Sequence, residues 1–385
     1  MLTQIFKERY GKTLIGACLI LIAIYLGAGW QSQKDWHTQY NYLYSDEFIY
    51  DYTNHPSYYV KSYDGEKEIR YESIDAYRQD VLTIGKNHDG NDTYFYNDFS
   101  YAQPQLILLT LFILGFLAFF VDYRTNFTRF LLTLPVQKKT LFRKKIGFVS
   151  LAISMALLIG IVGNCLIRSL MIDQSYFMIP IANLLLSGLS TFFTNILVFM
   201  VGLFLGISLG NLVTGPLSVL FVLFLSTIGS NFYSSFRLLY SLAFLNGKED
   251  VYAPFSLWIA WPEGRYYDWW VYLLYAGLFL LLFVVMEKVF LALSLDNEGE
   301  YVTVPFLRAP AYWIMALGTW FYLFMANYYP HDFFYIKLYD DFFETYQGII
   351  FRSLLLLFVC LIISLLMVYP KALMGWWHKR RNKLT

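Results

Sequence analysis

Residues 174–236 read QSYFMIPIANLLLSGLSTFFTNILVFMVGLFLGISLGNLVTGPLSVLFVLFLSTIGSNFYSSF and contain no Asp, Glu, Lys or Arg. A membrane-spanning helix needs about 20 mainly apolar residues, because only a helix satisfies its own backbone hydrogen bonds in hydrocarbon. This stretch of 63 residues is long enough for two crossings. The segment from Ser208 to Pro216 is polar and rich in helix-breaking residues, and it is the predicted turn between them.

Six further charge-free stretches occur in the chain of 385 residues, and each is long enough for one crossing. They cover residues 13–33, 99–121, 146–167, 269–286, 309–331 and 353–370. Only 15% of the residues are charged, against about a quarter in ordinary soluble domains. The sequence therefore predicts an all-α polytopic membrane protein with about eight transmembrane helices.

The predicted spans are residues 13–30, 104–121, 146–171, 179–207, 216–240, 269–291, 309–328 and 349–370. Apolar residues at helical spacing also predict a cytoplasmic surface helix over residues 1–12. The remaining predicted segments are an extracytoplasmic domain (31–103), a cytoplasmic loop (122–145), two extracytoplasmic loops (246–268 and 329–348) and a basic tail (371–385).

Lys and Arg residues concentrate in segments 1–12, 122–145 and 371–385. Cytoplasmic loops carry an excess of these residues, and an even number of spans places all three segments on one side. We therefore expect a multi-pass protein of the cytoplasmic membrane with both termini in the cytoplasm. The loop 296–308 is the exception, since it holds Asp296, Glu298 and Glu300 against only Arg308.

The segment 31–103 carries six basic and thirteen acidic residues, a net charge of −7, and predicts a small α+β extracytoplasmic domain between helices 1 and 2. Residues 58–71 predict a β-hairpin that turns at Asp64-Gly65, and Ser73 is placed to cap a following helix that ends near Gly85. The segment also holds 13 of the 33 tyrosines. Residence at the membrane interface is the favoured interpretation, and contact with a cationic or amphipathic ligand is the alternative.

Motifs for chemistry are missing. Gly11-Lys12-Thr13 is similar to the end of a phosphate-binding loop, but Phe6 stands where the first glycine is required. The stretch from Leu186 to Ser190 is similar to the signature sequence of transport ATPases, yet it lies inside a predicted span, where small residues favour close helix packing. The five histidines show no metal-ligand spacing. We therefore expect no catalytic, cofactor-binding or metal-binding residue, no enzyme activity and no nucleic-acid partner.

Charged residues near the span ends have two interpretations. For Arg168, Glu287 and Lys288 we expect side chains that extend toward the water interface. Arg237 follows several polar residues at the outer end of a span. It is a candidate for an outer polar cavity, and an interfacial anchor is the alternative.

The loop 122–145 predicts a short amphipathic helix with Phe127, Phe130, Leu131 and Leu134 on one face, ended by Pro135 and followed by basic residues. The run Leu131-Leu-Thr-Leu-Pro-Val136 with these basic residues resembles the "LLxLPVSR" turn of the permease subunits of ABC-2 type exporters. In that family the turn forms a coupling helix that contacts a separate cytoplasmic ATPase. The resemblance implies that ATPase coupling involves Phe127, Arg129, Phe130, Leu131, Leu134, Pro135, Lys138 and Lys139.

The resemblance implies a permease that moves a peptide, antimicrobial or lipid-like substrate across the cytoplasmic membrane. Its partners are two copies of an ATPase subunit, which binds ATP and Mg, a second permease chain (itself or a sibling) and membrane lipids. Two alternatives stay open. One is a non-transporting peptide-immunity or sensor protein, and the other is a polytopic lipid-modifying enzyme that uses His331 and Asp332.

Overall fold

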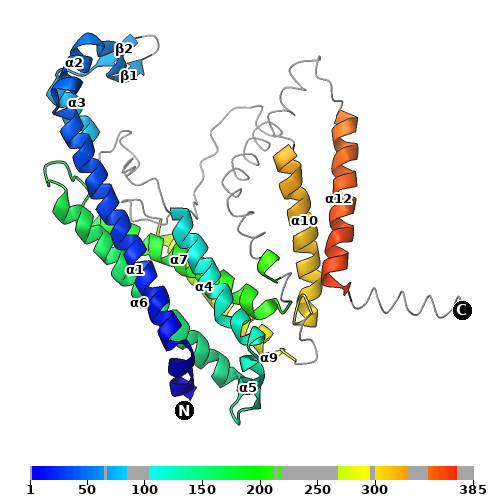
Figure 1. Cartoon of the computed structure of the whole chain (residues 1–385). Coiled ribbons are helices and arrows are strands. Elements are labelled where there is room, and N and C mark those ends of the chain that lie inside the picture. Colours follow the sequence, from blue (N-terminus) through cyan, green and yellow to red (C-terminus); the bar gives the residue numbers. More distant parts are fainter. Residues whose placement is uncertain are drawn as a thin grey trace, which may run out of the picture. The chain divides into compact units, whose positions relative to one another are not determined.

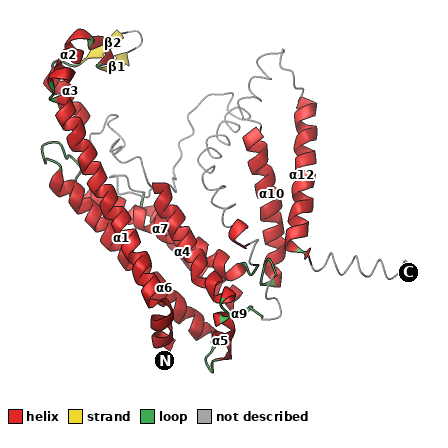
Figure 2. Cartoon of the chain, viewed as in Figure 1, coloured by secondary structure: helices red, strands yellow, loops and turns green. Residues whose placement is uncertain are grey.

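The computed structural model describes residues 2–64, 67–84, 104–211, 215–218, 268–294, 300–327 and 346–370. Helices make up most of this part of the chain (Figures 1 and 2). The long helices are α1 (Leu2–Leu43), α4 (Pro104–Arg124), α6 (Lys138–Met171), α7 (Ile181–Ser208), α9 (Trp269–Leu291), α10 (Arg308–Asn327) and α12 (Tyr346–Val368). The short elements are α2 (Asp46–Asn54), η1 (Pro56–Tyr58), β1 (Val60–Asp64), β2 (Lys67–Arg70), α3 (Ile74–Leu82), α5 (Phe127–Thr133) and η4 (Pro305–Leu307).

Within the described residues, 6 helices are long and apolar enough to cross a membrane: α1, α4, α6, α7, α9 and α12. They coincide with six of the predicted spans, and the all-α membrane class follows from them. α10 occupies the predicted span 309–328 but is not among these six. The predicted span 216–240 lies outside the described residues except at its first three positions, as do most of the predicted outer loops and the basic tail.

The amino terminus differs from the prediction of a separate surface helix over residues 1–12. These residues and the first predicted span belong to one unbroken helix, α1, which continues to Leu43. The physical reason is tertiary packing: Leu2 and Phe6 are buried, and the Phe6 ring lies 6.5 Å from the ring of Phe148 on α6. No proline interrupts the segment, so nothing ends the helix before its apolar part.

The chain divides into two compact units, which are described separately. Unit 1 comprises Met1–Leu114, Thr140–Val201 and Phe255–Phe283. Unit 2 comprises Gly115–Lys139, Gly202–Pro254 and Val284–Thr385.

In unit 1, glycines let α6 approach α1 closely. A Cβ on Gly160 would lie 2.9 Å from the Tyr25 ring, and one on Gly29 would lie 3.2 Å from the Asn164 side chain. α7 and α9 meet around Leu197, Val271 and Tyr275, which are all buried. Glycines at a helix contact, as between α1 and α6, are typical of helices that associate inside membranes, where dispersion contacts replace the hydrophobic effect.

A small segment of unit 1, residues 44–84 and here called the outer segment after its predicted location, follows directly on α1 and contains α2, the two strands and α3 (Figure 1). β1 and β2 pair antiparallel, and the register places Asp64 opposite Lys67. Residues 65 and 66 lie outside the described part of the chain, so the predicted turn at Asp64-Gly65 is described only up to Asp64. The strand register is irregular between Val60 and Ser62.

α3 begins where the sequence predicts. The Ser73 hydroxyl accepts a hydrogen bond from the Ala76 amide at 3.1 Å, as a helix N-cap does. The helix ends at Leu82, and Gly85 lies outside the described residues. The Trp36 indole of α1 donates to the Leu82 carbonyl at 3.0 Å, and Ile84 pairs with Phe177 in the turn between α6 and α7. The outer segment thus rests on the ends of membrane helices, the support that its small size requires.

Unit 2 holds the carboxyl half of α4, the last two turns of α7, the end of α9, and the pair α10 and α12, which lie side by side (Figure 1). The Trp320 indole of α10 donates to the Ser353 carbonyl of α12 at 3.0 Å. α4 and α7 touch at Gly206, where an added Cβ would lie 2.3 Å from the Phe116 carbonyl oxygen. Only a glycine permits this backbone approach, because the obstructing atom belongs to a helix backbone and cannot rotate away.

Gly206→Ala is expected to lower the melting temperature of the purified protein, since forcing atoms into a packed contact costs about 1–3 kcal/mol. Gly277→Ala on α9 is the matched control, because its Cβ would meet nothing within 4 Å. That variant is expected to melt at or slightly above the wild-type temperature, as alanine is the better helix former. Thermal unfolding in detergent checks both, and equal melting temperatures for the two variants would contradict the close contact.

Candidate functional site

Residues 125–139, here called the elbow, connect α4 to α6 within unit 2 and contain α5. The turn after α4 depends on Asn126, whose φ of 56° makes it the one non-glycine residue with a positive φ in the described chain. Asparagine tolerates this left-handed conformation better than most residues. After α5, Leu134 is extended, as the steric demand of the following proline requires. A second turn then leads directly into α6 at Lys138.

The faces of α5 are divided between burial and exposure. Thr128 and Leu131 are buried, whereas the Phe130 side chain is 48% exposed. Phe127 is half-buried and stacks on Phe130, with ring centroids 5.6 Å apart. Arg129 and Pro135 are exposed, and Leu134 is half-buried. The elbow therefore presents an aromatic pair beside a cationic side chain, while Leu131 anchors it from beneath.

The two lysines of the elbow contact the carboxyl end of α9. The Lys139 ammonium forms an ion pair with Glu287 at 3.2 Å, and the Lys138 ammonium donates to the Leu293 carbonyl at 3.1 Å. The sequence assigned both lysines to contact with another protein and expected Glu287 to extend alone toward water. Glu287 is instead only 13% exposed and paired, since the elbow folds onto the end of α9.

The end of α7 is covered by residues 300–304, here called the strap. The Thr303 amide and hydroxyl both donate to the Ser208 carbonyl, at 2.9 and 3.0 Å. The Tyr301 carbonyl accepts from the Gly210 amide at 3.2 Å. The two Thr303 bonds satisfy the Ser208 carbonyl, which the end of α7 leaves without an intrahelical partner. The acidic character of this loop has a local explanation as well, because Glu300 forms an ion pair with Arg308.

Arg168 differs from the prediction that its side chain extends toward the interface. It is 1% exposed within unit 1, one turn after Asn164 on α6. The Asn164 side chain donates to the Tyr25 carbonyl at 3.0 Å, and the Asn195 side chain of α7 hydrogen-bonds the Tyr25 hydroxyl. Arg168 therefore continues the buried face of α6 that Asn164 begins. A polar group buried among apolar helices stabilises their association through such bonds.

Polar residues of α7 also contact α9 within unit 1. Ser190 lies 2.6 Å from the Tyr272 hydroxyl, and Thr194 lies 2.7 Å from the Tyr275 hydroxyl. A Cβ on Gly188 would lie 3.1 Å from Ile161. The stretch from Leu186 to Ser190 therefore serves helix packing, and no ATPase signature is needed to account for it.

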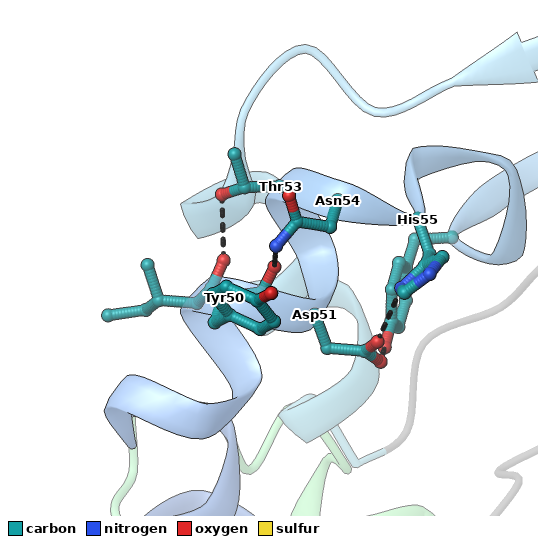
Figure 3. Close-up of polar contacts among 7 residues, drawn as sticks. Tyr50, Asp51, Thr53, Asn54 and His55 are labelled. Atoms are coloured by element: carbon teal, nitrogen blue, oxygen red, sulfur yellow. Dashed lines mark hydrogen bonds and ion pairs between the residues drawn. The ribbon is translucent and has the colours of Figure 1, made fainter.

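A second polar cluster lies in the outer segment, at the end of α2 (Figure 3). The Asp51 carboxylate is 2.9 Å from His55 Nδ1 and also accepts a hydrogen bond from the Tyr59 hydroxyl. Beside it, the Phe48 ring is buried among the rings of Tyr42, Tyr52, Tyr59 and Tyr77. Several of the segment's tyrosines thus form an aromatic core, whereas Tyr50 and Tyr58 are 71% and 74% exposed.

The hydrogen bonds of this cluster shift two pKa values in opposite directions. The hydrogen bond from the Tyr59 hydroxyl, and to a smaller extent the one with His55, stabilises the carboxylate and lowers the pKa of Asp51 below its ordinary value. The Asp51 carboxylate in turn raises the pKa of Tyr59, since ionisation would place two negative charges in contact. Asp51 therefore links α2 to η1 in its ionised form.

Other predicted positions lie beyond the described part of the chain. Arg237, the candidate for an outer cavity, is outside it, as are His331 and Asp332. Among the described residues, no group of three His, Cys, Asp or Glu side chains is arranged to hold a metal ion. Comparison with protein-family models, curated proteins and solved structures gives no match.

The pairing of Lys139 with Glu287 is the contact that the sequence interpretation missed. A signal for it exists, because the predicted topology places both residues on the same side of the membrane with opposite charges. What the sequence lacks is the arrangement of the helices, which decides which of the seven basic residues between Asp122 and Ile146 lies beside α9.

Acidification is expected to loosen the end of α2 in the wild type. Because the folded-state pKa of Asp51 is lowered, its stabilising contribution is complete above the ordinary carboxyl range of about 4 and is lost as the pH falls through the folded-state value. Asp51→Asn removes the charge and is expected to lack this acid transition. Near-ultraviolet circular dichroism of the tyrosines, recorded from neutral pH downward, measures it. Glu72→Gln on the exposed connection before α3 is the control that retains the transition, and an identical acid profile in the Asp51 variant would refute the assignment.

Proposed function

We propose that this chain is the permease subunit of an ABC-2 type exporter. It moves a peptide, antimicrobial or lipid-like substrate across the cytoplasmic membrane with about eight spans and a small α+β domain outside. Energy comes from two copies of a separate ATPase, and a second permease chain completes the assembly. Both termini and the elbow lie in the cytoplasm.

The observation that carries the proposal is the elbow. It is a short helix between two long apolar helices, with Phe130 and Arg129 exposed at its surface and Pro135 ending it. An exposed aromatic ring flanked by a cationic side chain is typical of a docking element, because aromatic and arginine residues dominate the binding energy of protein interfaces. The sequence pattern around Leu131 supports the choice of an ATPase as the partner.

The remaining features support transport rather than chemistry. Long apolar helices with large outward-facing side chains, such as Leu19 of α1 and Phe358 of α12, favour contact with lipid. The described spans carry few ionisable groups of the kind that ion-driven carriers use near the bilayer midplane. Work on a substrate then requires an energy source on another subunit. Closure of the ATPases on ATP would press on the elbow and tilt the attached helices as rigid bodies.

Phe130→Asp combined with Leu134→Asp is expected to release the ATPase while the permease stays in the membrane. The carboxylates would have to be buried without partners, which opposes docking. The measurement is a pull-down with tagged permease from membranes of the source cells, followed by detection of a bound P-loop ATPase and of ATP hydrolysis in the eluate.

Phe306→Asp is the matched control, because Phe306 is another exposed phenylalanine of unit 2 and lies outside the elbow. Its eluate is expected to contain as much ATPase as the wild type. A wild-type eluate that binds a peptide ligand but contains no ATPase would contradict the proposal and favour the sensor alternative.

A further inference from the structure

The elbow is attached to the end of α9 by two contacts that come from adjacent lysines. Lys138 and Lys139 are consecutive, and their partners Leu293 and Glu287 lie at and just beyond the last turns of α9. All four residues belong to unit 2. One contact is an ion pair and the other caps a backbone carbonyl, so together they restrain both the position and the orientation of the elbow.

The two contacts act at different points, one on α9 and one on the chain that follows it. The Lys138 ammonium donates to the carbonyl of Leu293, two residues beyond the end of α9, so it fixes the connection that leaves the helix. It also places a positive charge near the carboxyl end of α9, where the helix dipole favours one. Glu287 is only 13% exposed, whereas the Lys139 side chain remains 51% exposed. A half-buried carboxylate beside apolar residues requires a counter-charge more than an exposed lysine does. The attachment therefore depends mainly on the negative charge of the Glu287 carboxylate.

Two neighbouring lysines differ from Lys139 in their surroundings. Lys288 follows Glu287 on α9 but is exposed, and Lys144 lies further along α6 and is also exposed. An apolar contact between α4 and the same end of α9 joins the Phe119 and Phe290 rings, 6.0 Å apart. Since α5 has only seven residues, it cannot hold its own position by helix stability alone.

We propose that Lys139 and Glu287, with Lys138, are positioning residues that clamp the elbow to α9, so that the elbow and the end of α9 move as one body. The functional consequence of this inference rests on the proposed function. A movement of α5 caused by the ATPase is transmitted to α9 through the clamp, in addition to α4 and α6. Because α9 is one unbroken helix from Trp269 to Leu291, a displacement of its end is carried along its axis.

Spin labels on Thr133→Cys and Lys288→Cys measure the clamp directly, since both positions are exposed and lie outside the contacts. The three native cysteines, Cys18, Cys165 and Cys360, are first replaced by serine or alanine. Double electron–electron resonance, a pulsed electron paramagnetic resonance method, then gives the distance distribution between the labels on α5 and α9 in the full-length protein. The unmodified clamp is expected to give one narrow distribution.

Lys139→Glu and Glu287→Lys are each expected to lose the narrow distribution, because each places like charges in contact. The double variant, Lys139→Glu with Glu287→Lys, restores the opposite charges and is expected to recover it. Lys144→Glu makes the same charge change on α6 away from Glu287 and is expected to keep the wild-type distribution. A narrow distribution in both single variants would overturn the clamp. A distribution that is broad only in the double variant would overturn it as well.

The same label pair, with the ATPase bound, tests transmission. In the wild type the distance is expected to stay unchanged between the nucleotide-free state and the state trapped with ATP and vanadate, whereas in Lys139→Glu it is expected to shift although the ATPase remains bound. A nucleotide-dependent change in the wild type would overturn the inference that the two move together. Absence of any bound ATPase would instead refute the proposed function, and the nucleotide-free measurement would still decide whether the clamp exists.

Discussion

The absence of water in a bilayer interior constrains this chain more than any single side chain does. Every backbone N–H and C=O group there must find a partner within the protein, and an α-helix provides all of them locally. The long charge-free stretches therefore have one regular solution, and the described part of the chain adopts it in six apolar helices. Irregular structure in the described part is confined to the elbow, the strap, the outer segment and the connections between helices.

Inside this helical frame, polar side chains are placed where several helices can share them. Tyr25 is bonded by Asn164 from α6 and by Asn195 from α7, so three helices meet at one residue. Arg168 is buried one turn further along the same face of α6. Because lipid offers no competing hydrogen bonds, such contacts and the close approach at Gly160 determine which helices pair.

The sequence predicted the outline of the elbow correctly, since Pro135 and the apolar spacing define a short helix with local rules alone. It also predicted apolar stretches that fall within the described long helices, because hydrophobic length is a local property. It failed at residues 1–12 and at Arg168 for the same reason. Whether a helix continues, or whether an arginine reaches water, depends on neighbours that are distant in sequence, such as Phe148 in the first case.

By itself the sequence determined the membrane class, the positions of most long helices, the capping of α3 by Ser73 and the existence of a basic turn after α4. These follow from composition and from interactions over a few residues. Only the tertiary structure decided that Lys139 meets Glu287, that the strap covers the end of α7 and that Asn164 meets Tyr25. Such pairings join residues more than 90 positions apart, and no local rule specifies them, because they depend on how the helices pack.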